Sequence, residues 1–163
     1  MALDNVRSYV EGVGLEERVM VFPVSSATVP LAAEAAGVIP ARIAKTLSFY
    51  GSDGVIVVVV AGDTKIDSRK FKEIFHVKSK MLRPEDVLEQ TGHPVGGVCP
   101  FLLPKDVKVY LDESLKRFVT VFPACGSDYS AVELTPEELF MHSKALSWVD
   151  VCKGWHHQNM CFL

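Results

Sequence analysis

Two apolar runs separated by a four-residue turn constrain the fold of this chain more than any other feature. Residues 44–50 and 55–61 have strand-forming composition, and the Gly-Ser-Asp-Gly sequence between them is typical of a tight connection. The second run is too short to cross a bilayer. The sequence therefore predicts a β-hairpin.

Short helices and further strands are predicted around this hairpin. The expected helices cover residues 4–11, 28–36, 67–75 and 84–90, with one more that begins after Thr135. The first of them should carry one apolar face, made of Val6, Tyr9, Val10 and Val13. The other expected strands cover residues 17–22, 108–111, 118–122, 130–134 and 145–151. Short strands mixed with short helices indicate an α+β fold, although the sequence does not fix the strand order.

Helix-capping signals define two of the helix boundaries. Thr28 has Pro30 in the first turn after it, and Gly37 stands where that helix should end. Thr135 and Glu138 form a Thr-x-x-Glu capping box, which predicts the start of the last helix.

Length and composition are those of one globular domain. The 163 residues are 48% hydrophobic and 23% charged, and no repeat or low-complexity linker divides them. The N-terminus carries charges where a signal peptide needs an apolar stretch, so we expect a cytoplasmic protein with no membrane partner. The four cysteines show no zinc-type spacing, which predicts reduced thiols.

The net charge of −3 argues against a general polyanion binder, and DNA is not an expected partner. Locally, however, residues 65–83 contain seven basic side chains and two acidic ones. This surplus fits either a phosphate-binding surface or a solvated helix face.

Several common catalytic signatures are absent from the sequence. It contains no P-loop, no dinucleotide-binding glycine motif, no zinc-protease motif and no serine-hydrolase elbow. His156 and His157 lie near two cysteines in the tail, but adjacent histidines are a weak signal and we expect no metal or cofactor. Cys99 is interpreted as a buried thiol, since no neighbouring sequence provides a base.

Three other features stand out together. Lys45 follows an apolar run at the start of a predicted strand, where a charge needs an anionic partner. Gly96 and Gly97 allow backbone N–H groups to approach a ligand, within a loop bounded by prolines. A third glycine, Gly126, starts the segment Gly-Ser-Asp. Taken singly, each fits a packed lysine stem or an ordinary turn.

Four segments carry a resemblance to a known family. They read IAKTLSFY at 43–50, VVVVAGDTKIDSRKF at 57–71, TGHPVGGVCPF at 91–101 and ACGSDYSAVELTPEEL at 124–139. In these four segments together, the chain resembles the YbaK/prolyl-tRNA editing family of aminoacyl-tRNA deacylases. The match extends over residues 22–151 and leaves residues 152–163 as a tail. The resemblance implies a single compact α+β domain with a mixed, barrel-like sheet surrounded by short helices.

The resemblance also implies a function and a set of site residues. The expected activity is hydrolysis in trans of the ester in mischarged tRNA, with cysteine or another wrong amino acid on proline tRNA. Mischarged tRNA is then the partner, and a prolyl-tRNA synthetase is left open as a second one. Lys45 would anchor the tRNA end, while Gly96 and Gly97 would contact the carbonyl or the attacking water. The residues implied in substrate binding are Thr46, Cys99, Pro100, Gly126, Ser127 and Asp128.

This sequence departs from the family pattern at two positions. Many relatives have Gly-Ser-His-Asp where this chain has Gly126-Ser127-Asp128-Tyr129, so the acidic residue is displaced by one. Cys99 stands where a small hydroxyl residue or alanine is more common, which leaves the choice of amino acid open. Two alternatives to a deacylase remain: a non-catalytic module that binds tRNA or a synthetase, and a small-molecule regulatory domain.

Overall fold

The predicted hairpin forms the centre of a mixed five-stranded sheet. The computed structural model describes residues 2–95, 98–127 and 129–155. Strand β2 (Ile43–Gly51) pairs antiparallel with β3 (Gly54–Ala61), from Ala44 opposite Ala61 to Gly51 opposite Gly54. The sheet order is β6-β2-β3-β5-β8, and the three other pairings are parallel. The other three strands are β5 (Lys108–Asp112), β6 (Phe122–Pro123) and β8 (Ser147–Val149), and β6 and β8 form the two edges.

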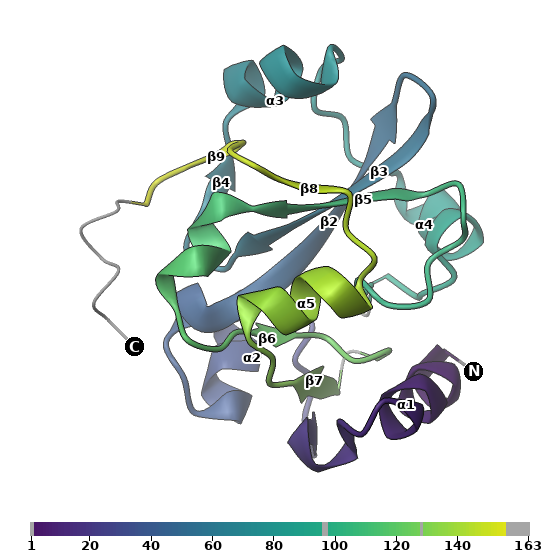
Figure 1. Ribbon diagram of the computed structural model, residues 1–163, viewed down its shortest axis with the longest axis vertical. Helices are drawn as coiled ribbons and strands as arrows, with labels where there is room; N and C mark the ends of the chain where they lie inside the picture. The colour runs from purple at the N-terminus through teal and green to yellow at the C-terminus, as the bar shows by residue number, and fades with distance from the viewer. Residues whose placement is uncertain (1, 96–97, 128, 156–163) are drawn as a thin grey trace.

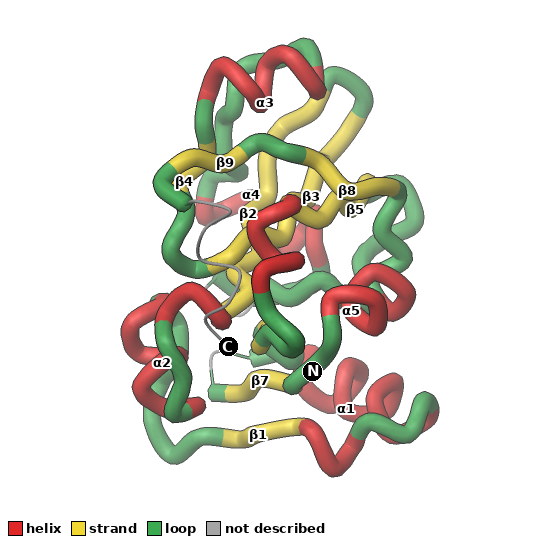
Figure 2. The backbone as a smooth tube through the Cα atoms, turned by 60° about the vertical axis from the view of Figure 1, so that its left-hand side comes forward, coloured by secondary structure: helices red, strands yellow, loops and turns green. Residues whose placement is uncertain are grey.

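Two short antiparallel pairs and the helices surround this sheet. The pairs are β1 (Val19–Val21) with β7 (Ser130–Val132), and β4 (Lys65–Ile66) with β9 (Cys152–Lys153). The α-helices are α1 (Ala2–Gly12), α2 (Val29–Ala36), α3 (Ser68–Phe75), α4 (Pro84–Thr91) and α5 (Pro136–His142). Single 3₁₀ turns are η1 (Glu16–Arg18), η2 (Pro40–Arg42) and η3 (Glu113–Arg117). Helices α3 and α1 lie at opposite ends of the molecule (Figures 1 and 2).

Strand β3 is buried on both faces, which explains its uninterrupted apolar sequence. Val57 and Val59 belong to one core, shared with α1 and α5, while Val58 and Val60 belong to a second core that includes α3. Successive side chains of a strand point to opposite faces, so burial on both sides requires an apolar residue at every position. The α+β, single-domain prediction is confirmed.

Both predicted capping motifs are confirmed. Thr28 Oγ1 accepts a hydrogen bond from the Leu31 N–H at 3.4 Å, and Gly37 ends α2 with a φ of 72°. Thr135 and Glu138 form both bonds of the capping box at the start of α5.

Several predicted strands and one predicted face are wrong in part. Residues 118–121 are not a strand, because η3 precedes them and only Phe122–Pro123 pairs with β2. The strand predicted at residues 17–22 begins as η1 and is extended only from Val19. The strand predicted at residues 145–151 is shorter and consists of β8 alone. Val13 does not join the apolar face of α1, since it follows the helix and is 41% exposed. The tail predicted from residue 152 contributes β9 to the fold.

Within the described ranges, no helix is both long enough and apolar enough to cross a membrane.

Candidate active site

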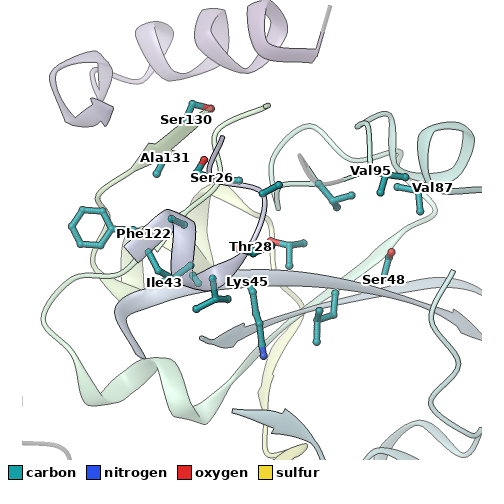
Figure 3. A pocket seen from close by; sticks show the side chains of 18 of the residues that line it. Ser26, Thr28, Ile43, Lys45, Ser48, Val87, Val95, Phe122, Ser130 and Ala131 are labelled. Atoms are coloured by element: carbon teal, nitrogen blue, oxygen red, sulfur yellow. The ribbon is translucent and has the colours of Figure 1, made fainter. Parts of the chain in front are cut away.

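A cavity of about 360 Å³ lies along the outer edge of strand β2 (Figure 3). Its wall is largely apolar and comes from α2, β2, β6, β7, the start of α4 and the loop after α4. The small hydroxyl residues on its wall are Ser26, Thr28, Thr46, Ser48 and Ser130. The larger apolar side chains on its wall are Val29, Ile43, Leu47, Met81, Leu82, Val87, Val95, Val98 and Phe122.

The cavity opens where the outer edge of β2 has no neighbouring strand. Strand β6 pairs with β2 only at Ile43 and Ala44, and the next contact on this edge is the bridge between Phe49 and Met81. The hydrogen bonds at that bridge join Leu82 N–H to the Ser48 carbonyl and Tyr50 N–H to the Lys80 carbonyl. Even-numbered residues of β2 therefore direct their backbone groups outward, and those of Thr46 face this gap.

The Thr46 hydroxyl is also without a partner. Its Oγ1 is the single buried side-chain nitrogen or oxygen that lacks a hydrogen bond among the residues that the structure describes. By contrast, Thr28 Oγ1 caps α2, and the Ser130 hydroxyl is 3.0 Å from that of Ser127. Buried polar atoms are normally satisfied, so an unpaired hydroxyl on a cavity wall is poised to bind a ligand.

Lys45 lies at the margin of the cavity with its ammonium group directed away from it. Figure 3 shows the side chain on the opposite side of β2 from Ser26 and Thr28. Its Nζ donates a hydrogen bond to the Thr64 carbonyl at 2.6 Å. Burial lowers the pKa of Lys45, and the charge of Asp63 opposes that shift.

A tight turn after β3 holds the carbonyl that binds Lys45. Gly62 has no room for a side chain, because an added Cβ would overlap the Pro40 carbonyl oxygen and lie 2.8 Å from a Val29 methyl group. Beside it, the Asp63 carboxylate receives two hydrogen bonds from Arg117, at 2.6 and 2.9 Å. Arg117 is 3% exposed, so this ion pair fixes the turn to the core.

Cys99 lies outside this cavity, in a closed cluster beneath the loop after α4. Its Sγ is 3.4 Å from Nε2 of His93, and the same Nε2 is 2.8 Å from the Phe101 carbonyl. Burial raises the pKa of Cys99 to about 12 and lowers that of His93, so the pair is neutral at pH 7. The base that the sequence did not reveal is adjacent to Cys99, but both side chains are 2% exposed or less.

The other predicted site residues flank the cavity wall. Pro100, Gly126 and Ser127 are absent from the lining, although Val98 and Ser130 belong to it. Gly126 has a φ of 93°, a conformation that favours glycine, and Ser127 Oγ accepts a hydrogen bond from Tyr129 N–H at 3.1 Å. Gly96, Gly97 and Asp128 lie outside the described residues, and their proposed roles stay predictions. His156, His157 and Cys161, at which no metal was expected, also lie outside the described residues.

Of the site residues predicted from the sequence, Lys45 and Thr46 line the cavity, and most of the rest of the wall was not predicted. Ser26 and Phe122 come from segments far from β2 in sequence, and only the fold brings them to its edge. The one sequence feature that indicated part of this wall was the polar turn before the Thr28 cap, since it contains Ser26 and leads to Thr28, and both residues line the cavity. In the described part of the chain, His, Cys, Asp and Glu side chains form no group of three or more able to hold a metal ion.

Comparison with protein-family models matches residues 24–141 to the aminoacyl-tRNA editing domain. That range contains most of the cavity wall and the turn beneath Lys45. The chain belongs to this family.

Named relatives include free-standing proteins and parts of synthetases. The chain is 56% identical to the uncharacterised protein YwhH of Bacillus subtilis over 95% of this chain and 99% of the relative. It is 31% identical, over 66% of each protein, to "Putative Cys-tRNA(Pro)/Cys-tRNA(Cys) deacylase EbsC" of Enterococcus faecalis. A match to a proline–tRNA ligase of Thermotoga sp. is 37% identical but covers 56% of this chain and 16% of the ligase.

The fold is that of a solved structure described as "a putative trans-editing enzyme for prolyl tRNA synthetase". The two have a TM-score of 0.83 and 30% identity, over 94% of this chain and 98% of that one.

Proposed function

We propose that this protein is a free-standing aminoacyl-tRNA deacylase that removes cysteine, or another wrongly attached amino acid, from proline tRNA. The observation that carries the proposal is the cavity at the unpaired edge of β2, with Lys45 at its margin and, on its wall, Thr46, whose buried hydroxyl has no hydrogen-bond partner among the described residues. The similarity to a protein named for this activity, and to one described as a trans-editing enzyme, supports it.

The size and lining of the cavity fit a small aminoacyl group. A volume of about 360 Å³ accommodates a small aminoacyl group together with part of the ribose that carries it. Its apolar wall discriminates by volume, where one methylene group changes binding by about 1–3 kcal/mol. The amino acid would lie in the cavity, and the nucleotide would extend past Lys45 toward the other side of β2.

The chemistry requires a water molecule and a few fixed donors. Water attacks the carbonyl carbon, the bond to the ribose 3′-oxygen breaks, and that oxygen takes up a proton as the amino acid leaves. The Thr46 hydroxyl and its outward N–H are available to the reacting carbonyl, and one such donor contributes about 3 kcal/mol, roughly a hundredfold in rate. The neighbouring ribose hydroxyl of the substrate can relay the proton.

The described cysteines are unsuited to covalent catalysis. Cys99, Cys125 and Cys152 are fully buried, and burial raises the pKa of each, to about 12, 11 and 12. A thiol attacks as a thiolate, so these groups are inert at neutral pH. The proposal therefore assigns the attack to water.

A panel of charged tRNAs tests the proposal, with Lys45→Ala as the diagnostic variant. Proline tRNA carrying cysteine, alanine, serine or proline is compared with the cognate cysteine and alanine tRNAs. We expect cysteine on proline tRNA to be released fastest, and Lys45→Ala to lower that rate by about a hundredfold while circular dichroism stays unchanged.

Unchanged turnover in Lys45→Ala would remove this residue from the mechanism. Saturable, salt-sensitive tRNA binding without release of any amino acid would instead identify a non-catalytic tRNA-binding module.

A further inference from the structure

The short pair β4–β9 places two lysines directly opposite each other. Lys65 is aligned with Lys153, and Ile66 with Cys152. Cys152 is fully buried and Ile66 packs against the second core, so by strand alternation the two lysines share the outer face. Both are exposed. Like charges directly opposite across antiparallel strands destabilise the pairing, so an anion bound between the two lysines would stabilise it.

No carboxylate within the described ranges forms an ion pair with either lysine. The two acidic residues nearest in sequence to Lys65 are already engaged. Asp63 is held by Arg117, and Asp67 caps α3 through hydrogen bonds from the backbone of Arg69 and Lys70. Asp67 still attracts Lys153 at longer range, but its carboxylate accepts hydrogen bonds from the first turn of α3.

The lysine pair is continuous with Lys45. Thr64, whose carbonyl accepts the Lys45 hydrogen bond, immediately precedes β4. The charge of Lys65 is also one of the influences that lower the pKa of Lys45, after burial, which places the two ammonium groups in each other's field. The three lysines are thus Lys45 at the cavity margin, Lys65 on β4 and Lys153 on the adjacent strand β9.

The rest of the basic stretch at 65–83 is partly neutralised. Arg69 pairs with Glu73, Lys70 with Asp150, and Arg83 with Glu85 and Asp86. Lys72, Lys78 and Lys80 form no ion pair within the described residues, but of this stretch only the charge of Lys65 acts on Lys45, and Lys153 lies directly opposite Lys65.

We propose that Lys65 and Lys153 bind the sugar-phosphate backbone of the tRNA acceptor end, next to the aminoacylated nucleotide at the cavity. This inference rests on the proposed function for the identity of the RNA. Phosphate contacts of this kind set the position of the RNA rather than select its sequence, and they make affinity depend on salt.

Binding of uncharged proline tRNA at a series of salt concentrations tests the inference. The variants are Lys65→Gln, Lys153→Gln and both together. Lys105→Gln is the matched control, because Lys105 is also exposed and forms no ion pair with the described residues. Lys105 precedes the start of β5. The other end of β5, at Asp112, is the end near β9, since the Asp112 carboxylate accepts a hydrogen bond from the Val151 N–H just before β9. We expect the slope of log affinity against log salt to decrease by about 1 per lysine removed. The double variant should bind roughly twentyfold more weakly at 0.15 M salt.

The control variant should keep the wild-type slope and affinity, and a Lys65→Arg, Lys153→Arg protein should restore both. An unchanged slope in the double variant, or an equal loss in Lys105→Gln, would overturn the inference. Because the RNA is uncharged, the result does not depend on hydrolysis. A reduced slope without any deacylation would support RNA binding by the two lysines and refute the proposed deacylase function. Deacylation with an unchanged slope would support the deacylase function and refute RNA binding by the two lysines. No tRNA binding by the wild type would overturn both.

Discussion

The cavity beside β2 and the Cys99–His93 cluster are two regions with opposite chemistry. The cluster contains a thiol 3.4 Å from an imidazole, which is the residue pair of many nucleophilic enzymes. The cavity offers hydroxyl groups, backbone and a lysine at its margin. Yet the cluster is closed and neutral, and its ring nitrogen binds the Phe101 carbonyl. The cavity is open and has an unsatisfied hydroxyl on its wall.

The difference shows that access and unmet hydrogen-bonding capacity locate the candidate site better than residue type does. A buried, satisfied polar pair stabilises the loop that contains it. An unsatisfied buried hydroxyl costs free energy in the unbound protein, and that cost is recovered when a ligand binds. Three variants or measurements sharpen this contrast.

Thr46→Val should give the largest effect after Lys45→Ala, and it should separate stability from activity. Valine has the shape of threonine without the hydroxyl, so the unsatisfied atom disappears. We expect the free energy of unfolding to rise by about 1 kcal/mol, and kcat/KM for deacylation to fall by up to about a hundredfold, the contribution of one such donor. Chemical denaturation and single-turnover kinetics measure the two quantities.

Thr46→Ser keeps the hydroxyl and serves as the control, with activity near that of the wild type. A Thr46→Val protein that is both less stable and fully active would show that the hydroxyl has a structural partner and no ligand.

Cys99→Ala should leave catalysis nearly unchanged. Because this thiol is buried away from the cavity, we expect kcat/KM to stay within about twofold while stability falls by about 1–2 kcal/mol through lost packing. A hundredfold loss of activity with a native circular dichroism spectrum would make Cys99 part of the reaction and reverse the comparison.

Thiol alkylation at pH 8 should show the smallest change of all. With a pKa of about 12, roughly one Cys99 side chain in ten thousand is a thiolate at this pH. We expect mass-spectrometric mapping to find Cys99 and Cys125 unmodified in the native protein and fully modified in denaturant. Rapid native labelling of Cys99 would contradict the closed cluster.

The same shifts have a consequence for stability. Each thiol pKa is raised in the folded state, so the unfolded chain loses thiol protons first as the pH rises. The contribution of these thiols is therefore complete below about pH 9, the ordinary thiol pKa, and decreases as the pH approaches 11–12.

The sequence was sufficient for the local parts of the fold. The hairpin, the Thr28 cap and the Thr135 capping box depend on neighbouring residues, and all three are confirmed. Strand alternation also fixes the side of β2 on which Lys45 lies. Lys45 is two and four residues from Leu47 and Phe49, so its side chain points to the same face as theirs, the face of the second core.

Long-range pairing could not be obtained in the same way. The gap beside Thr46 exists because β6 leaves β2 after Ala44, and no local pattern specifies that register. The Cys99–His93 contact depends on how the loop folds back over six residues. Residues 118–121 connect η3 to β6, and η3 ends at the buried Arg117, whose ion pair with Asp63 spans 54 positions that no local pattern links.

The gap in β2 also bears on whether this strand edge can pair with another chain. An open strand edge invites pairing with another chain, which is a common route to aggregation. Here β6 closes the edge on one side and the Met81 bridge closes it on the other, so the opening is too short to admit a foreign strand. The interruption thus leaves backbone groups of β2 open to the cavity but is too short for another polypeptide to pair with them.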